Sequence, residues 1–268
     1  MADLPRSTQR LFGLEVAPLT LEEAVLLADH AIAARERLLI AVVNAAKIVK
    51  LRHDPLLRDS VLTADVTLAD GQSVVWASRL LRRPLPERVA GIDLCEELLS
   101  LADRQGLRVF LLGARPQVLA TLCDVIAERW PGVVVAGARD GYFAEEETEE
   151  IAEMIGGSGA DLLFLGLPTP LKETFLARYG DGLGVPVLHG VGGSFDVIAG
   201  ATRRAPVRWQ RFGMEWAYRL LQEPGRLWKR YLVTNIAFCG LVLRELVRPT
   251  PPYTRPDSTD PHSQGVTA

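Results

Sequence analysis

The sequence predicts an α/β fold: a Rossmann-like parallel sheet with helices on both faces, to which a helical, basic C-terminal module is attached. Continuous apolar runs recur along the chain, and each is followed by a glycine or a turn and then by a helical pattern. Such runs are typical of strands that are buried on both faces of a parallel sheet. Basic residues are concentrated after residue 202, where the pattern changes to long helical segments.

The elements follow in order from these patterns. Residues 20–35 have helical periodicity, and Thr20 and Glu23 match a capping box at its start. The apolar run Leu38–Val43 predicts a buried strand, with Asn44 at its carboxyl end and a short helix over residues 45–51. Further buried strands are expected at four later runs, residues 109–112, 133–136, 162–165 and 185–188.

Ligands of open parallel sheets bind beyond the carboxyl ends of the strands. Four turns should therefore converge on one crevice: Gly113, residues 140–142 with Tyr142, residues 166–168 and residues 190–195. The turn at Gly113 lacks the full G-x-G-x-x-G pattern, so a dinucleotide site is weakly supported and a mononucleotide site stays open.

The amino-acid composition bears on whether the chain has disulfides, a metal site or a membrane-spanning segment. Three widely separated cysteines and four histidines without ligand spacing predict neither a disulfide framework nor a metal site. No apolar run reaches the roughly 18 residues that a membrane span requires. The late apolar run over residues 236–247 carries Arg244 and Glu245. We therefore expect a cytoplasmic protein whose membrane contact is peripheral.

Charged residues are distributed unevenly along the chain. Residues 203–248 hold ten basic and three acidic residues, a net charge of +7, and the last twenty residues carry −1. The total of −3 leaves −9 for residues 1–202. We expect an α/β body over 1–202, a basic aromatic module over 203–248 and a disordered tail over 249–268. The basic module indicates an anionic partner.

Three segments carry a resemblance to a known family. They are ADVTLADGQSVVWASRLLRRPLPERVAGIDL from Ala64, GVGGSFDVIAG from Gly190 and RAPVRWQRFGMEWAYRLLQEPGRLWKRYL from Arg204. With these segments in the family's order, the chain resembles the WecG/TagA/CpsF family of bacterial glycosyltransferases over about residues 10–245. The resemblance implies inverting transfer from a UDP-sugar, UDP-N-acetylmannosamine in the best-known members. The acceptor is an undecaprenyl-diphosphate-linked sugar, and neither a divalent metal nor another cofactor is required.

The resemblance assigns three catalytic residues. Asp70 falls on the family's proposed general base, although Asp70-Gly71 alone would be read as a turn pair. Asn44 matches an asparagine whose amide could bind donor or acceptor sugar. Arg88 could bind a diphosphate or a sugar carboxylate through bidentate hydrogen bonds. The residues alone equally allow a surface ion pair of Arg88 with Asp93 or Glu87.

The donor site is expected around the glycine loop after the last strand, where backbone N–H groups can hold phosphate. The expected donor-binding residues are Gly113, Tyr142, Lys172, Gly192, Gly193, Ser194 and Asp196. Packing glycines are the alternative interpretation of the loop. Lys172 stands where the family commonly has glutamine, after a turn that is two residues longer, so this difference bears on the donor sugar.

The sequence has no Asp-x-Asp motif near a strand end, which is the motif that holds a metal-bound diphosphate in many sugar transferases. The resemblance assigns leaving-group stabilisation to Arg219, Arg226 and Arg230, which lie near one helical face unless Pro224 breaks the helix. Trp and Tyr residues interleave with these cations, as in segments that lie in a membrane interface.

The expected partners are a UDP-sugar, a polyprenyl-diphosphate-linked saccharide and the anionic inner face of the cell membrane, in surface polysaccharide or teichoic acid synthesis. A homo-oligomer is left open. Alternatives are another UDP-hexose or a uronic acid donor, a nucleic-acid-binding protein, which the −9 body opposes, and a Rossmann-type oxidoreductase, which the incomplete glycine fingerprint weakens. Nucleic acid is not among the expected partners.

Overall fold

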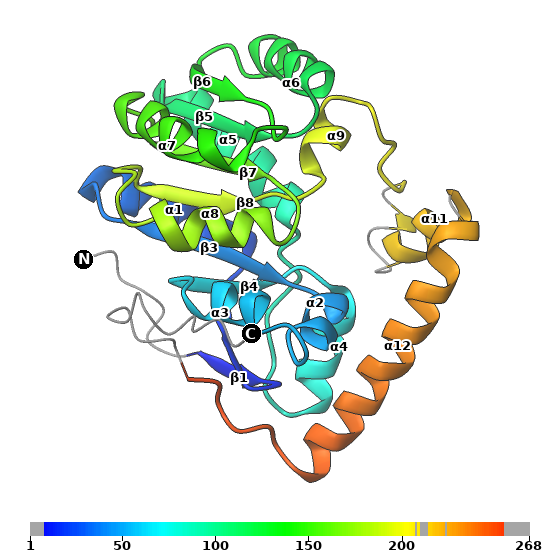
Figure 1. Ribbon diagram of the computed structural model, residues 1–268. Helices are drawn as coiled ribbons and strands as arrows, with labels where there is room; N and C mark the ends of the chain where they lie inside the picture. Colours follow the sequence, from blue (N-terminus) through cyan, green and yellow to red (C-terminus); the bar gives the residue numbers. More distant parts are fainter. Residues whose placement is uncertain (1–7, 207, 210–213, 223, 255–268) are drawn as a thin grey trace, which may run out of the picture.

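A computed structural model describes residues 8–206, 208–209, 214–222 and 224–254. Its centre is a six-stranded sheet in the order β4-β3-β8-β7-β5-β6, and all pairings are parallel (Figure 1). The strands are β3 (Leu38–Val43), β4 (Val66–Ala69), β5 (Arg108–Gly113), β6 (Val134–Arg139), β7 (Leu162–Gly166) and β8 (Val187–Gly190). The predicted α/β fold class is confirmed.

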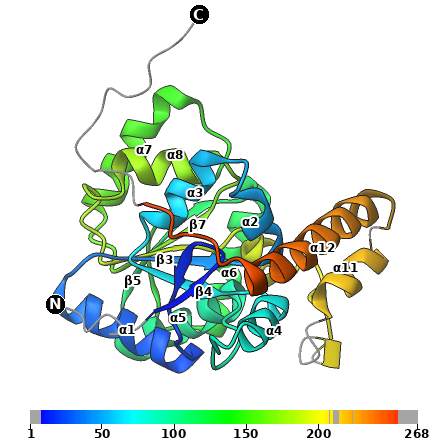
Figure 2. The ribbon, with the colours of Figure 1, turned by 90° about the horizontal axis from the view of Figure 1, so that it is seen from below.

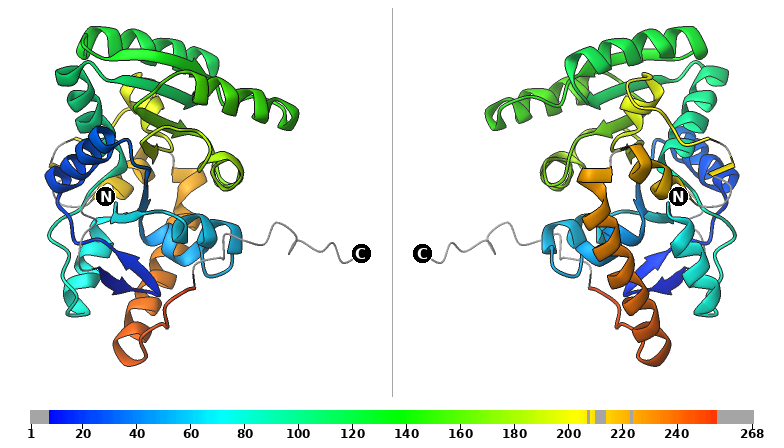
Figure 3. Two further views of the ribbon diagram at one scale, coloured as in Figure 1. Left: turned by 90° about the vertical axis from the view of Figure 1, so that its left-hand side faces the viewer. Right: turned by 90° about the vertical axis from the view of Figure 1, so that its right-hand side faces the viewer.

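Helices cover both faces of this sheet (Figure 3). One face packs against α1 (Leu21–Ala34), α5 (Gly91–Gln105), α6 (Pro116–Arg129) and α9 (Ser194–Ile198). The other packs against α7 (Thr148–Gly157), which follows the short turn η1 (Glu145–Glu147), and α8 (Leu171–Tyr179). The predicted capping box at the start of α1 is confirmed, because Thr20 and Glu23 exchange hydrogen bonds.

A second core lies beyond β4. It is built from the hairpin β1 (Gln9–Leu11) and β2 (Leu14–Val16), from α2 (Ala45–Lys50), α3 (Pro55–Leu62) and α4 (Gln72–Leu80), and from part of the C-terminal helix. The antiparallel hairpin was not predicted from the sequence. It joins the body through Ala17, whose N–H donates to the Thr67 carbonyl at 2.8 Å.

The C-terminal module forms α11 (Glu215–Gln222) and α12 (Pro224–Val247). Pro224 begins α12, so the helix restarts there, where the missing N–H of proline costs no intrahelical bond. The long α12 runs as an arm beside α2 (Figures 1 and 2). Phe238 is buried with its ring 5.4 Å from that of Phe12, so α12 forms part of the core of the body. No helix in the described part of the chain combines the length and apolar character needed to cross a membrane.

Two expectations from the sequence are wrong. The run that begins at Val133 was expected to be a buried strand, but Val134 is 42% exposed because β6 is the edge strand of the sheet. Packing was expected to end at about Pro249, yet the Tyr253 N–H donates to the Gly13 carbonyl at 2.9 Å and the Tyr253 ring lies 5.4 Å from the Arg58 guanidinium. The rest of the tail, residues 255–268, lies outside the described residues.

Candidate active site

Parallel pairing brings the predicted loops to one edge of the sheet. Asn44 follows β3, Asp70 follows β4, Gly113 ends β5 and the glycine loop follows β8. Tyr142 lies three residues past β6, and Lys172 lies in the first turn of α8, which follows β7. All of these loops therefore lie at the carboxyl edge of the sheet, and their convergence on one crevice stays a prediction.

Asp70 is held by backbone contacts from two directions. Its own N–H donates to the Val43 carbonyl at 2.9 Å, which continues the pairing of β4 with β3. Its Oδ1 accepts from the Gly91 N–H at 3.4 Å, at the start of α5. A Cβ at position 71 would lie 3.2 Å from the Asn44 Cβ, so Gly71 allows the close approach of these two strand ends.

The surroundings of Asp70 raise its pKa. Burial is the largest cause, and the negative charge of Glu215 adds to it. Lys47, Arg88 and the Gly91 N–H lower the pKa but do not outweigh burial. A carboxylate with a raised pKa holds a transferred proton more readily than an exposed aspartate does, which suits a general base.

Asn44 has a structural role in addition to any contact with substrate. Its Oδ1 accepts a hydrogen bond from the Lys47 N–H at 3.0 Å and caps the N-terminus of α2. The cap orients the amide at the edge of the sheet beside Gly71. The sugar contact expected of Asn44 stays a prediction.

Arg88 belongs to an ion cluster that joins the body to the C-terminal module. Its guanidinium lies 2.7 Å from Glu215 of α11 and 3.5 Å from Asp93 of α5, and its side chain is only 12% exposed. Arg204 pairs with the same two acids. The Asp93 pairing was one of the alternatives that the sequence left open, whereas Glu87 instead accepts from the Leu21 N–H. The cluster fixes the Arg88 guanidinium against α5 and α11, and its positive charge lowers the pKa of Asp70.

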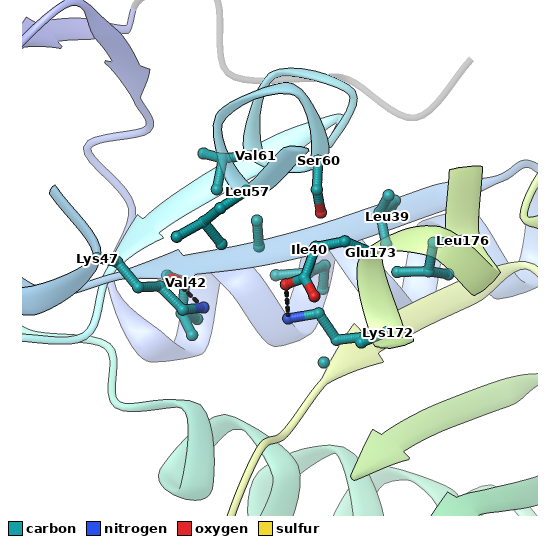
Figure 4. A pocket seen from close by; sticks show the side chains of 12 residues that line it. Leu39, Ile40, Val42, Lys47, Leu57, Ser60, Val61, Lys172, Glu173 and Leu176 are labelled. Carbon is teal, nitrogen blue, oxygen red and sulfur yellow. Dashed lines mark hydrogen bonds and ion pairs between the residues drawn. The ribbon is translucent and has the colours of Figure 1, made fainter. Parts of the chain in front are cut away.

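Lys47 is a site residue that the sequence reasoning missed. Its Nζ donates to the Val42 carbonyl at 2.8 Å, so the side chain folds back over the end of β3. It lines a cavity of about 20 Å³ together with Lys172 and Glu173 of α8 (Figure 4). This volume suits about one water molecule and excludes a sugar. Burial, followed by the charge of Lys172, lowers the pKa of Lys47 to about 8.

Two buried groups complete this edge of the sheet. Lys172 Nζ lies 3.0 Å from Oε1 of Glu173, whose side chain is fully buried. His189 of β8 faces the Gly91 carbonyl through Nε2 at 3.2 Å and the Ile40 carbonyl through Nδ1 at 3.4 Å. Burial lowers the pKa of His189 to about 4, so its imidazole is neutral at physiological pH and has a structural role.

The glycine loop after β8 borders open space. A Cβ at Gly192 or Gly193 would meet no atom within 4 Å, so packing does not require glycine at either position. Gly192 has a φ of +54°, a conformation that favours glycine. Ser194 is buried and its hydroxyl donates to the Val191 carbonyl at 2.7 Å, whereas Asp196 lies 3.7 Å from Arg115. That last pair connects the first turn of α9 with the start of α6.

Gly113 and Tyr142 differ in their surroundings. A Cβ at Gly113 would lie 2.4 Å from the backbone of Gly166, and its φ is +131°. Gly113 therefore packs the ends of β5 and β7 together. Tyr142 is 70% exposed at the rim, where its N–H donates to Asp140 at 2.9 Å. Their roles in donor binding stay predictions.

The arginines expected to stabilise the leaving group lie in the C-terminal helices. Arg219 is in α11, and Arg226 and Arg230 are in α12. Their side chains lie outside the described residues. Among the residues that are described, no three His, Cys, Asp or Glu side chains gather as metal ligands.

Comparison with known proteins gives the same family as the sequence motifs. Residues 9–251 match the model of the glycosyl transferase WecG/TagA/CpsF family. A protein of Bacillus spizizenii (strain ATCC 23059 / NRRL B-14472 / W23) is 38% identical over 202 residues, which cover 75% of this chain and 77% of the relative. That relative is named N-acetylglucosaminyldiphosphoundecaprenol N-acetyl-beta-D-mannosaminyltransferase. The chain therefore belongs to the WecG/TagA/CpsF family of glycosyl transferases.

Proposed function

We propose that this glycosyltransferase moves N-acetylmannosamine from a UDP-activated donor to a polyprenyl-diphosphate-linked saccharide. The name of the 38% identical relative supports both the sugar and the lipid-linked acceptor. The observation that carries the proposal for this chain is Asp70, which lies half-buried at the carboxyl edge of the sheet, accepts from the Gly91 N–H at 3.4 Å and has a pKa that burial raises. The product would enter surface polysaccharide or teichoic acid synthesis.

In the proposed reaction Asp70 is the general base. Its carboxylate accepts the proton of the acceptor hydroxyl while that oxygen forms a bond to the anomeric carbon of the donor sugar. The bond from this carbon to the UDP oxygen breaks, and its electron pair leaves with UDP. A single displacement of this kind inverts the anomeric configuration.

The leaving UDP requires positive charge. We assign this role to Arg219, Arg226 and Arg230, because guanidinium groups provide bidentate donors to phosphate oxygens. Arg88 is held near Asp70 by its ion pair with Glu215 and could contact the same diphosphate. With these cations the reaction would proceed without a divalent metal.

In this proposal α12 binds the membrane that holds the lipid-linked acceptor. Most of the exposed apolar side chains of α12 recur at helical spacing along one stripe, which includes Trp228, Leu232, Ile236, Leu243 and Val247. Lys229 is exposed beside this stripe. An apolar stripe flanked by basic residues suits peripheral binding to an anionic bilayer. We propose docking at the cytoplasmic, inner face of the cell membrane.

A second donor class has support from Lys172. It replaces the glutamine expected from the family pattern and lies on the same cavity as Lys47. The cavity itself is too small for a sugar, but the positive charge of two lysines at this edge of the sheet would favour a donor that carries a carboxylate and binds outside the cavity, such as a UDP-uronic acid. The ion pair of Lys172 with Glu173 compensates one of these charges, and this favours the uncharged N-acetylmannosamine.

A donor screen tests the proposal. Purified protein would be given separate UDP-sugars and a short-chain polyprenyl-diphosphate-linked N-acetylglucosamine, with release of UDP and the anomeric configuration of the product as readouts. UDP-N-acetylmannosamine should give acceptor-dependent UDP release and an inverted product. Preference for a UDP-uronic acid would select the second donor, and a retained configuration would rule out the single displacement.

A further inference from the structure

Arg88 and Arg204 approach the same carboxylate from two different segments of the chain. Arg88 lies in the loop between α4 and α5, and its Nη1 is 2.7 Å from Oε2 of Glu215 in α11. Arg204 follows α9 and precedes α11, and its Nε is 3.6 Å from Oε1 of the same glutamate. The two oxygens of one carboxylate are therefore shared between two guanidinium groups.

Asp93 of α5 anchors both arginines to the body. Its Oδ2 lies 3.5 Å from Nη2 of Arg88, and its Oδ1 accepts a hydrogen bond from Nη2 of Arg204. Asp93 is in the first turn of a helix that packs in the main core, whereas Glu215 belongs to the C-terminal module. If Glu215 turned away, Asp93 would still hold both guanidinium groups, and their remaining N–H donors would be open to another anion.

The loop that carries Arg88 is joined to the strand end that carries Asp70. The Val89 N–H donates to the Ala69 carbonyl at 2.9 Å, and the Gly91 N–H donates to Asp70 Oδ1 at 3.4 Å. Both contacts are within three residues of Arg88 along the chain. The backbone next to Arg88 is therefore fixed against the segment of the proposed general base.

Hydrogen-bonding capacity is left over within this cluster. Arg204 Nε is buried and has no hydrogen-bond partner in the part of the chain that the structure describes, because Glu215 Oε1 is beyond hydrogen-bond distance. The side chains of Arg88, Arg204 and Glu215 are 12%, 23% and 26% exposed, so water screens their charges only in part. A buried donor without a partner is unfavourable, so an oxyanion that came closer than this carboxylate would be favoured there.

We propose that Arg88 and Arg204 form a diphosphate subsite, and that Glu215 occupies this subsite until a diphosphate displaces it. Carboxylate and phosphate groups present similar pairs of oxygens to a guanidinium group, and two guanidinium groups can serve both phosphates of a diphosphate. The inference rests on the diphosphate contact proposed above for Arg88. It adds Arg204 as a second ligand and Glu215 as the residue that limits affinity. UDP and the lipid-linked acceptor both carry a diphosphate, so both are tested.

Equilibrium binding tests the inference without relying on catalysis. Wild type is compared with Glu215→Gln, which keeps the shape of the side chain and removes the competing charge, and with Arg88→Gln and Arg204→Gln. Glu97→Gln is the matched control, because Glu97 is an exposed acid of α5 outside these ion pairs. Calorimetric titration measures Kd for UDP and, separately, for the short-chain polyprenyl-diphosphate-linked N-acetylglucosamine. Circular dichroism establishes that each variant is folded.

Glu215→Gln should tighten the binding of UDP about fivefold, because the diphosphate no longer competes with a carboxylate for the two guanidinium groups. Arg88→Gln and Arg204→Gln should each weaken UDP binding about tenfold, and Glu97→Gln should match wild type. In a protein that already carries Arg204→Gln, the gain from Glu215→Gln should be smaller. A gain for the short-chain acceptor alone would assign the subsite to the lipid diphosphate.

A folded Glu215→Gln protein that binds neither ligand more tightly than wild type overturns the inference, and so does a gain no larger than that of Glu97→Gln. If an arginine variant does not fold, the comparison of Glu215→Gln with its control still decides between the two results. Weaker UDP binding in Arg88→Gln without a gain in Glu215→Gln overturns only the inference. Unchanged UDP binding in a folded Arg88→Gln protein would instead refute the proposed contact on which it rests.

Discussion

Asp70 shows how a single residue at this edge weakens the fold. Because its pKa is raised in the folded protein, the folded state binds the proton more tightly than the unfolded state does. The stability that this proton contributes is fully present at pH values below the pKa of Asp70 in the unfolded chain. It is lost as the pH rises through the pKa of Asp70 in the folded protein. In its ionised form the half-buried carboxylate is therefore a destabilising group.

Replacement of Asp70 by asparagine should consequently raise the melting temperature at pH 7. Asparagine has nearly the same shape and cannot ionise, so the cost of holding a charge away from water disappears. The difference from wild type should shrink toward pH 4, where Asp70 is increasingly protonated. Melting curves at both values check this, and a variant that melts below wild type at pH 7 would contradict the burial argument.

The position of a site residue could be predicted where that residue directly follows a strand. Asn44 and Asp70 follow apolar runs directly, so their place at the carboxyl edge could be predicted from the sequence. Lys47 could not be found in this way, since a lysine in a short helix ordinarily extends into water. Only the tertiary contact with the Val42 carbonyl turns it back over the sheet.

At the scale of elements, the close packing of strand ends shapes the site. Gly113→Ala should destabilise the protein by more than about 2 kcal/mol, because the new methyl group would overlap the backbone of Gly166 at a positive φ. Gly157→Ala is the control, since a Cβ at Gly157 meets nothing within 4 Å. Urea unfolding measures both changes. A loss at Gly113 no larger than at Gly157 would mean that the strand ends can separate.

The pattern of elements was predictable as far as it depends on periodicity. The run Leu38–Val43 is β3 as expected, and the Pro224 restart follows from the chemistry of proline. The exposure of β6 was not predictable, because its apolar run looks the same at the edge of a sheet as at its centre. The hairpin of β1 and β2 has strands of only three residues each, too short for a periodic signal.

For the whole molecule, α12 should serve as both core element and membrane contact. Replacement of Leu232 and Ile236 by glutamate should strongly reduce sedimentation with anionic vesicles, because both side chains lie on the exposed stripe. Met154→Glu on α7 is the control for an exposed apolar residue elsewhere. Sedimentation equal to wild type in the double variant would remove α12 as the docking surface. Activity on a soluble short-chain acceptor should be retained.

Deletion of the whole C-terminal module is a poor test of membrane docking. Phe238 and Val242 of α12 are buried in the second core, and Arg83 pairs with Glu245 at 3.4 Å. Truncation before Arg203 would uncover this core and confuse lost folding with lost docking. Surface substitutions on the intact chain separate the two effects.

Chelation tests whether arginines or a divalent metal ion stabilise the negative charge of the departing diphosphate. If arginines stabilise the departing diphosphate, EDTA should leave the rate of transfer unchanged, because no divalent ion takes part. The control is the same assay with added Mg²⁺ or Mn²⁺. Activity that EDTA abolishes and either ion restores would show that a metal has the role assigned to the arginines.

The most direct test of the central claim is the turnover of Asp70→Asn with UDP-N-acetylmannosamine and the lipid-linked N-acetylglucosamine acceptor, with UDP binding measured on the same preparation. Loss of the general base should reduce turnover by about two to four orders of magnitude. UDP binding should remain, because the donor contacts are expected on the other loops. Turnover near that of wild type in a folded, UDP-binding variant would contradict the assignment of Asp70 as the catalytic base.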